Sequence, residues 1–322
     1  MSIAADALQP SFVRGLFELR GRGQMFGLAD AITTAPKSGF DLDFEDARRL
    51  IVVDFRETTH VTAIFGGDAC RFASASFASI STVSSEIEDK RAVPWALIKL
   101  YYSAFYAGHS ILRLLGQSCS YLEPSHVQHL RKLTVALGLE PKFTVDAGLY
   151  HFTVNGGQTG FALERATGRV GGAHEAFWKV FGAFIEEMTE QVLLGRLAPG
   201  EAREVFLKLD AWRSILQRHG AIASSSWLSA MRNEIQYKLT HKLWPPASLN
   251  KHARSALARI VKQWERDPMN LDLSHLSRSD LEQFVLACTF TVTLCRVLLA
   301  RIAERSSAGP RSFASEPLVL CC

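Results

Sequence analysis

Residues 93–116, VPWALIKLYYSAFYAGHSILRLLG, decide the fold class of this chain. Apolar and small residues recur in this stretch every three or four positions, which is the spacing of one face of an α-helix; they are Ile98, Tyr101, Phe105, Gly108, Leu112 and Leu115. Pro94 suits the first turn of a helix, and Gly116 suits its end. The stretch therefore predicts a long helix with an apolar stripe, of the kind that packs in a helical bundle.

Helical periodicity continues almost to the end of the chain. Ser279 and Glu282 form a capping-box pattern ahead of an apolar stripe that ends near Ile302. Further helices are predicted at about 126–137, 174–194, 201–219, 224–239 and 249–266. We therefore expect a mainly α fold, with a bundle of five or more helices over 90–306, a Gly-rich insertion at about 139–172 and a flexible tail over 307–322.

The first 89 residues mix two kinds of signal. Residues 11–20 are predicted to form a short helix. Residues 49–55 (RLIVVDF) and 58–65 (TTHVTAIF) are rich in β-branched and aromatic side chains, which is typical of strands, and the glycine pair that follows favours a turn. We therefore expect a small mixed α+β module over 1–89, ahead of the helical bundle.

The composition is that of a globular protein. The chain has 322 residues, of which 48% are hydrophobic and 21% charged, and this excludes disorder. Its six cysteines include no CxxC pair, and no signal-peptide pattern opens the chain, so we expect reduced thiols and a cytoplasmic location. The apolar runs at 100–112 and 283–295 have 13 residues each, whereas a membrane span needs about 18 or more, so none is expected.

Positive charge is concentrated in one segment. The whole chain has a net charge of only +4, but residues 232–266 hold eight basic side chains against Glu234 and Glu265. This excess indicates either a polyanion-binding surface or a solvated helix face. As nucleic-acid contacts the segment offers Lys238, Lys242, Lys251, Arg254, Arg259 and Lys262.

The common catalytic and nucleotide-binding motifs are absent from the sequence. There is no GxxxxGK[ST] phosphate loop, no GxSxG and no HExxH. His126 and His129 lie three positions apart, but no third ligand accompanies them. We therefore expect neither a metal site nor a cofactor.

One motif carries chemistry: residues 226–244, SWLSAMRNEIQYKLTHKLW, which contain Arg232-Asn233 and, nine positions after the arginine, His241. An Arg-polar pair followed by His in the penultimate helix of a bundle resembles the HEPN superfamily (higher eukaryotes and prokaryotes nucleotide-binding). Residues 101–109, YYSAFYAGH, are similar to the aromatic first helix of that family. The resemblance covers about 90–306.

The resemblance implies a homodimer in which two Arg/His motifs meet and cleave RNA without a metal, as in toxins and antiviral defence effectors. In such a site the ribose 2′-OH attacks the adjacent phosphorus. Arg232 would stabilise the charge that grows on the phosphoryl oxygens, His241 would take or give the proton, and Asn233 would orient the arginine or the phosphate.

The spacing departs from the family pattern, which places His five to seven positions after Arg. On a continuing helix, nine residues turn about 900°, so His241 would point away from Arg232, although Asn233, Tyr237 and His241 would share a face. Two interpretations follow. The chain is an endoribonuclease with an atypical motif, or it is a catalytically inactive module that binds nucleic acid, a nucleotide or a protein partner such as an antitoxin.

The predicted first helix supplies a supporting set. Tyr102, Tyr106, His109 and Arg113 share a stripe opposite the apolar one. This stripe is either a polar face packed against loops or, with Tyr237, a group of side chains that supports Arg232. A third interpretation of the whole chain is a subunit of a larger complex that uses the N-terminal module as an adaptor.

Overall fold

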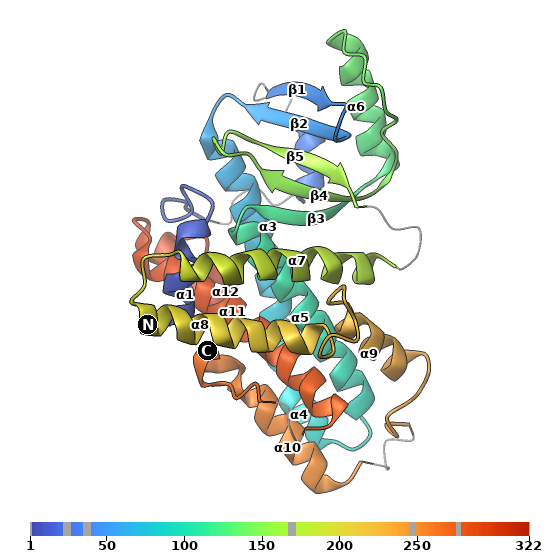
Figure 1. Cartoon of the computed structure of the whole chain (residues 1–322), viewed down its shortest axis with the longest axis vertical. Helices are drawn as coiled ribbons and strands as arrows, with labels where there is room; N and C mark the ends of the chain where they lie inside the picture. The colour runs from blue at the N-terminus through green and yellow to red at the C-terminus, as the bar shows by residue number, and fades with distance from the viewer. Residues whose placement is uncertain are drawn as a thin grey trace.

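The computed structural model describes residues 2–21, 27–34, 40–166, 172–244, 249–274 and 278–321. The fold is mainly helical, as predicted, with one small antiparallel sheet. The molecule is elongated, and the sheet with helix α6 (Pro124–Ala136) occupies one end of it (Figure 1). Helices form the rest.

Helix α11 (Asp280–Arg305) is the core helix of the bundle. It packs against α5 (Val93–Leu114), which packs along α3 (Thr58–Ile80). The predicted capping box forms, because Ser279 Oγ accepts a hydrogen bond from the Glu282 N–H and the Glu282 carboxylate accepts one from the Ser279 N–H. Among the described residues α11 alone is long and apolar enough to cross a membrane, but 89% of its most apolar window is buried inside the protein.

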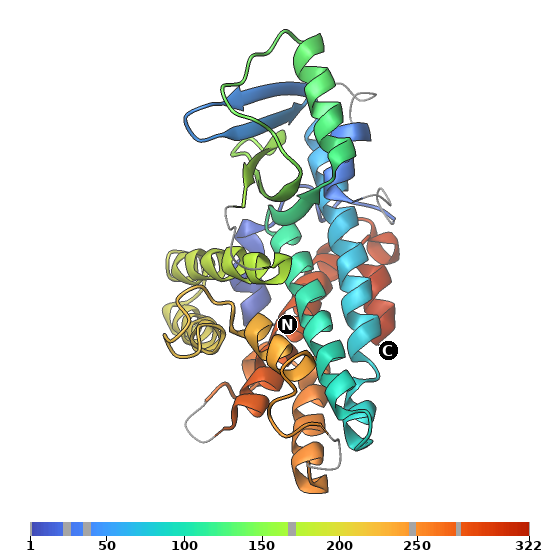
Figure 2. The same ribbon diagram turned by 90° about the vertical axis from the view of Figure 1, so that its right-hand side faces the viewer.

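Four further helices surround this core. Helices α7 (Ala173–Leu193) and α8 (Pro199–Leu216) pack on each other and run across the direction of α3 and α5 (Figures 1 and 2). Helix α9 (Trp227–Gln236) packs on α5 and α7. Helix α10 (Lys251–Val261) packs on α4 (Val83–Glu88) at the end of the molecule far from the sheet. The arrangement places α9 where α5 and α7 meet.

The sheet joins segments that the sequence analysis assigned to different parts of the chain. Its strand order is β1-β2-β5-β4-β3, with every neighbouring pair antiparallel. Ile51 lies opposite Leu163, so a strand from the first 89 residues pairs with one from the predicted insertion. The strands are Phe40–Glu45, Leu50–Phe55, Gln117–Leu122, Gly148–Val154 and Gly160–Arg165.

The strand predicted over 58–65 is wrong. These residues form the first turns of α3, and the glycine pair 66–67 lies inside that helix. Residues about one turn apart along α3 are buried, and tertiary packing of this stripe overrides the β-propensity of the individual side chains; they are Val61, Phe65, Ala69, Ala73, Phe77 and Ile80. The helix predicted at 11–20 is also wrong, since those residues form mostly turns after α1 (Ile3–Leu8).

The end of the chain packs on the bundle, in contrast to the loose tail expected. Phe313 is fully buried, and Ser312 forms a β-bridge with Arg20. An apolar ring in a polar sequence is enough to anchor this segment. The remaining short elements are α2 (Ala31–Thr34), α12 (Ser315–Leu318) and the 3₁₀ turns Gln9–Ser11, Leu28–Asp30, Lys262–Glu265, Pro268–Asn270, Gly309–Arg311 and Val319–Cys321.

Candidate functional site

Arg232 is a buried cation whose hydrogen-bonding capacity is largely unused. Only 8% of the residue is exposed, and among the described residues its guanidinium donates a single, long hydrogen bond, 3.4 Å from Nη1 to Gln236 Oε1. Its Nε has no partner within the described part of the chain, nor does any described carboxylate form an ion pair with it. The guanidinium lies 5.5 Å from the ring centre of Tyr101 and 5.7 Å from that of Tyr237.

The packing of α9 explains this position. Leu228, Met231 and Ile235 are buried at helical spacing and hold α9 against its neighbours. Arg232 follows Met231, so its side chain starts at the edge of the buried face and lies across Tyr101 of α5. The stacking rings accommodate the flat guanidinium by cation–π attraction, but they do not satisfy its N–H groups.

Tyr101 and His174 complete a cluster around Arg232. The Trp178 indole N–H donates to Tyr101 Oη at 3.1 Å, so the hydroxyl hydrogen is free to go to His174 Nδ1 at 3.0 Å. Burial, and then the positive charge of Arg232, lower the pKa of His174 to about 4, and burial raises the pKa of Tyr101 to about 12. At pH 7 His174 is therefore neutral, and with Nδ1 accepting it carries its proton on Nε2.

The cluster thus offers donors and lacks a base. Arg232 supplies N–H groups and a fixed positive charge, and His174 supplies an Nε2–H group. The hydroxyl of Tyr101 is already occupied by Trp178, His174 and Ser229. Such a set suits an anion, above all a phosphate or carboxylate, and is poorly suited to taking up a proton.

His241 belongs to a different set of contacts. Helix α9 ends at Gln236, and Leu239, His241 and Lys242 adopt left-handed backbone conformations, with φ of 53°, 62° and 53°. His241 Nε2 lies 2.8 Å from a carboxylate oxygen of Glu234, and neither a hydrogen bond nor a ring contact joins it to Arg232. Because the helix stops, the face that Asn233, Tyr237 and His241 would share does not form, and Asn233 is left exposed.

The side chains predicted to support Arg232 fall into two groups with different contacts. Tyr102 meets His174 edge to face at 5.5 Å, and Tyr237 meets Arg232, so these two tyrosines belong to the cluster. Tyr106 and His109 instead face Phe72 of α3, and His109 is enclosed by aromatic rings. Burial and the charge of Arg113 hold the pKa of His109 well below its usual range. The stripe packs against helices rather than loops.

Five of the six basic residues predicted to contact nucleic acid are exposed. They are Lys238, Lys242, Lys251, Arg259 and Lys262. The last three of these fall within an arc of about 80° along α10 and the turn that follows it. Arg254 is the exception, because it donates to the backbone oxygens of Leu249 and Glu88 and so ties α10 to α4.

Two aromatic rings near the motif are exposed as well. Tyr237 is 68% exposed and Trp95, at the start of α5, is 61% exposed. Trp95 meets Trp244 edge to face at 5.8 Å, and the Trp244 indole N–H donates to the Ile235 carbonyl. Cations interleaved with exposed rings are the usual surface for single-stranded nucleic acid, because the rings stack on unpaired bases.

Sequence reasoning missed Tyr101 as a member of the site. It stands on the apolar stripe of 93–116 and is fully buried, so its periodicity predicts a core residue. His174 stands at the start of the helix predicted at about 174–194, where its position indicates a cap region. A helical pattern does not show which distant side chain a buried hydroxyl will meet, and 73 positions separate these two residues.

Of the paired histidines of α6, His126 has structural partners, whereas His129 Nε2 is buried without a hydrogen-bond partner among the described residues. His126 Nδ1 accepts a hydrogen bond from the Glu123 N–H at 2.9 Å, and its Nε2 lies 3.0 Å from Asp30. Within the described ranges, no group of three or more His, Cys, Asp or Glu side chains is placed to hold a metal ion.

Comparison with known proteins gave no match of any kind: no protein-family model, no curated protein and no solved structure is similar to this chain.

Proposed function

We propose that this chain is a HEPN-like cytoplasmic protein that binds single-stranded RNA, with Arg232 contacting a backbone phosphate. The observation that carries the proposal is the buried guanidinium, which keeps Nε unpartnered and has no described carboxylate beside it. An unsatisfied buried donor costs about 1–3 kcal/mol. A phosphate oxygen that accepts from this donor would remove that cost.

The surface beside Arg232 supports RNA as the anion. The exposed lysines at 238 and 242 flank the backbone path that leads away from Tyr237, and α10 adds further positive charge. Tyr237 and Trp95 supply rings on which unpaired bases can stack, which favours a single strand over a duplex.

The test is fluorescence anisotropy with a labelled single-stranded RNA of mixed sequence. We expect Arg232→Gln to weaken binding by about tenfold to a hundredfold, the usual loss for a charged hydrogen bond. Arg232→Lys keeps the positive charge and loses the planar guanidinium fork, so its RNA affinity should lie between that of the wild type and that of Arg232→Gln. Arg203→Gln, at an exposed position of α8, is the matched control and should bind like the wild type.

Substitutions at exposed lysines provide a second test, which can be used even if substitution of the buried Arg232 unfolds the protein. Lys238→Gln with Lys242→Gln should lower affinity and reduce the slope of log affinity against log salt by about 1.4, which corresponds to two phosphate contacts on a single strand. The proposal would be refuted if the double lysine variant kept the wild-type affinity and the wild-type salt slope, and if folded Arg232→Lys also bound RNA like the wild type.

A second candidate is metal-independent RNA cleavage by a homodimer of toxin or antiviral defence type, held in check by a protein partner. The observation in its favour is the His241–Glu234 pair, since a carboxylate that orients an imidazole prepares it for proton transfer. The same RNA, incubated with EDTA and run on a denaturing gel, separates the candidates. Cleavage that is lost in His241→Ala and in Arg232→Lys supports the enzyme; binding without cleavage supports the binding module.

A further inference from the structure

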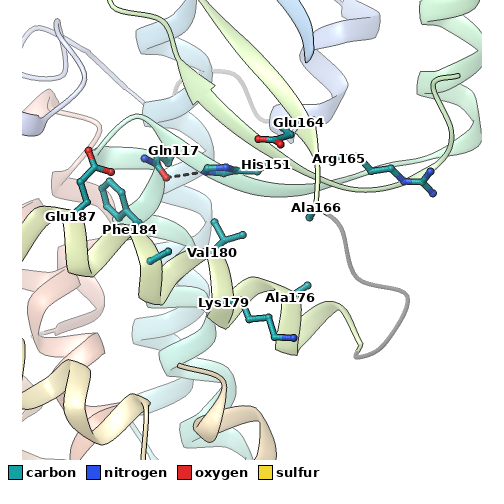
Figure 3. A pocket seen from close by; sticks show the side chains of 11 residues that line it. Gln117, His151, Glu164, Arg165, Ala166, Ala176, Lys179, Val180, Phe184 and Glu187 are labelled. Carbon is teal, nitrogen blue, oxygen red and sulfur yellow. Dashed lines mark hydrogen bonds between the residues drawn. The ribbon is translucent and has the colours of Figure 1, made fainter. Parts of the chain in front are cut away.

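A cavity of about 410 Å³ lies between α7 and the sheet (Figure 3), and Arg232 is not among the residues that line it. Its upper wall comes from three adjacent strands, through Gln117, His151 and Glu164, and its lower wall from α7, through Val180 and Phe184. The volume is within the range of small-molecule sites. Nothing in the proposed RNA contact uses these residues.

The polar groups of the upper wall are mostly acceptors. His151 lies directly opposite Glu164 in the register of β4 and β5, so the two side chains share one face of the sheet. The His151 Nε2–H donates to Gln117 Oε1 at 2.9 Å, which leaves Nδ1 as an acceptor. Burial lowers the pKa of His151, so it is neutral at pH 7 and contributes no positive charge.

The two cations that line the cavity are each paired with a carboxylate outside its lining. The Lys179 amine pairs with Glu175 at 2.7 Å, and the Arg165 guanidinium pairs with Asp146 at 3.2 Å and points away from the cavity (Figure 3). Glu164 and Glu187 have no cationic partner among the described residues. A ligand would therefore meet two carboxylates, one from each wall.

The cavity is also elongated. A second hollow of about 340 Å³ shares Gln117, Phe184 and Glu187 with the first and continues along α7 towards Asn155. Glu187 thus stands where the two hollows join, and Glu164 stands on the strand side of the first one. Apolar side chains of α7 lie between them, so the groove combines separated negative charges with an apolar floor.

We propose that this groove binds a linear aliphatic amine of the diamine or polyamine class. One ammonium group pairs with Glu164, where neutral His151 adds no opposing charge, and a second ammonium group pairs with Glu187. The methylene chain between them packs on Val180 and Phe184. The inference stands on its own, because it uses none of the residues that contact RNA in the proposed function.

Isothermal titration of the full chain with spermidine and with putrescine tests this site. We expect saturable binding of at least one amine and no binding of butane-1,4-diol, which keeps the chain of putrescine and lacks its charges. Glu164→Gln with Glu187→Gln should lower the affinity several-fold, since both carboxylates are exposed and an ion pair to an exposed carboxylate contributes modestly.

Two further variants make the result specific. Glu190→Gln removes the same charge from an exposed position of α7 outside the cavity and should leave binding unchanged. Ala183→Phe fills the groove without altering any charge and should weaken binding. No saturable binding, or an equal loss in Glu190→Gln and in the double variant, would overturn the proposal.

Discussion

Individual buried charges in this molecule have opposite surroundings. Arg113 and Asp68 are both buried and meet at 2.5 Å, and Arg71 adds a second contact to the same carboxylate at 2.5 Å. Arg232 is buried with almost no polar partner. The first arrangement is complete within the protein and joins α3 to α5. The second is incomplete, which is why we assign it to a ligand.

Substitution of Arg113 should therefore lower the stability of the protein substantially. Arg113→Met leaves the buried Asp68 carboxylate with the half-exposed Arg71 as its cationic partner and a long hydrogen bond from the Leu28 N–H, and we expect the free energy of unfolding to fall by about 3 kcal/mol. Urea denaturation of the wild type and the variant measures this difference in the free energy of unfolding. The double variant Arg113→Met with Asp68→Asn should lose less than the sum of the two single losses, because the pair is removed together. Additive losses would show that the two side chains are not coupled.

The pKa of His174 predicts a pH dependence of stability. The folded value is about 4, whereas an unfolded histidine titrates near 6.5. Between these values the unfolded chain binds a proton that the folded protein does not, so stability is full above about pH 6.5 and is lost as the pH falls towards 4. Because His174 is only half-buried, we expect about 1 kcal/mol between about pH 7 and pH 5.

The matched variant for this prediction is His174→Asn, which keeps a polar side chain beside Tyr101 and does not titrate. The wild type should lose more stability than the variant when urea denaturation is repeated at about pH 5. Equal losses in the two proteins would contradict the assignment of the neutral imidazole.

At the level of elements, the candidate site depends on the close approach of α7 to the turn that begins α9. Gly182 lies in α7 opposite Ser225, and a Cβ added to it would stand 2.2 Å from the Cβ of Ser225. Ser225 has φ of 55°, so this turn is already in the left-handed region. Only glycine allows the two segments to meet, and their contact sets the start of α9 and thus the position of Arg232.

Gly182→Ala should therefore destabilise the protein and disturb the site. The clash costs about 1–3 kcal/mol, while the better helix propensity of alanine returns less than about 1 kcal/mol. We expect a lower midpoint of urea denaturation together with weaker RNA binding. Gly200→Ala, in α8 with open space around the new methyl group, is the control and should show neither effect.

On the scale of the whole molecule, the segment around Gly21 and the segment 311–313 contact each other, and the latter also contacts α3. The backbone N–H of Gly21 donates to the Arg311 carbonyl at 2.8 Å, and the Cys70 thiol donates to the Phe313 carbonyl. Phe313 is fully buried against α3 and its surroundings, and Gly66 of α3 lies close to this ring. The last segment is thus part of the core.

Phe313→Ala should lower the free energy of unfolding by about 3–5 kcal/mol, the usual cost of truncating a buried phenylalanine. Val319→Ala, at an exposed position of the same segment, should change it by less than about 0.5 kcal/mol. Urea denaturation of both variants checks this. A Phe313→Ala protein as stable as the wild type would restore the loose tail that the polar composition of 307–322 suggests.

Local patterns in the sequence predicted the long helices well. Residues 93–116 and 279–302 have apolar stripes at helical spacing, and both form helices with ends close to the predicted ones. Predictions from side-chain composition alone were wrong where the pattern of burial favoured another structure. Residues 58–65 have strand-like composition, yet they form a helix because their buried stripe packs along α5.

The sequence by itself determined the helical class of the chain, the capping of its last helix and the segment where positive charge gathers, because these depend on residues within a few positions of one another. Only the tertiary structure decided that strands from 40–55 pair with strands from 148–165, that Tyr101 and His174 meet Arg232, and that α9 stops before His241. These features come from contacts between residues far apart along the chain, whose free energy depends on burial and on partners that no local pattern contains.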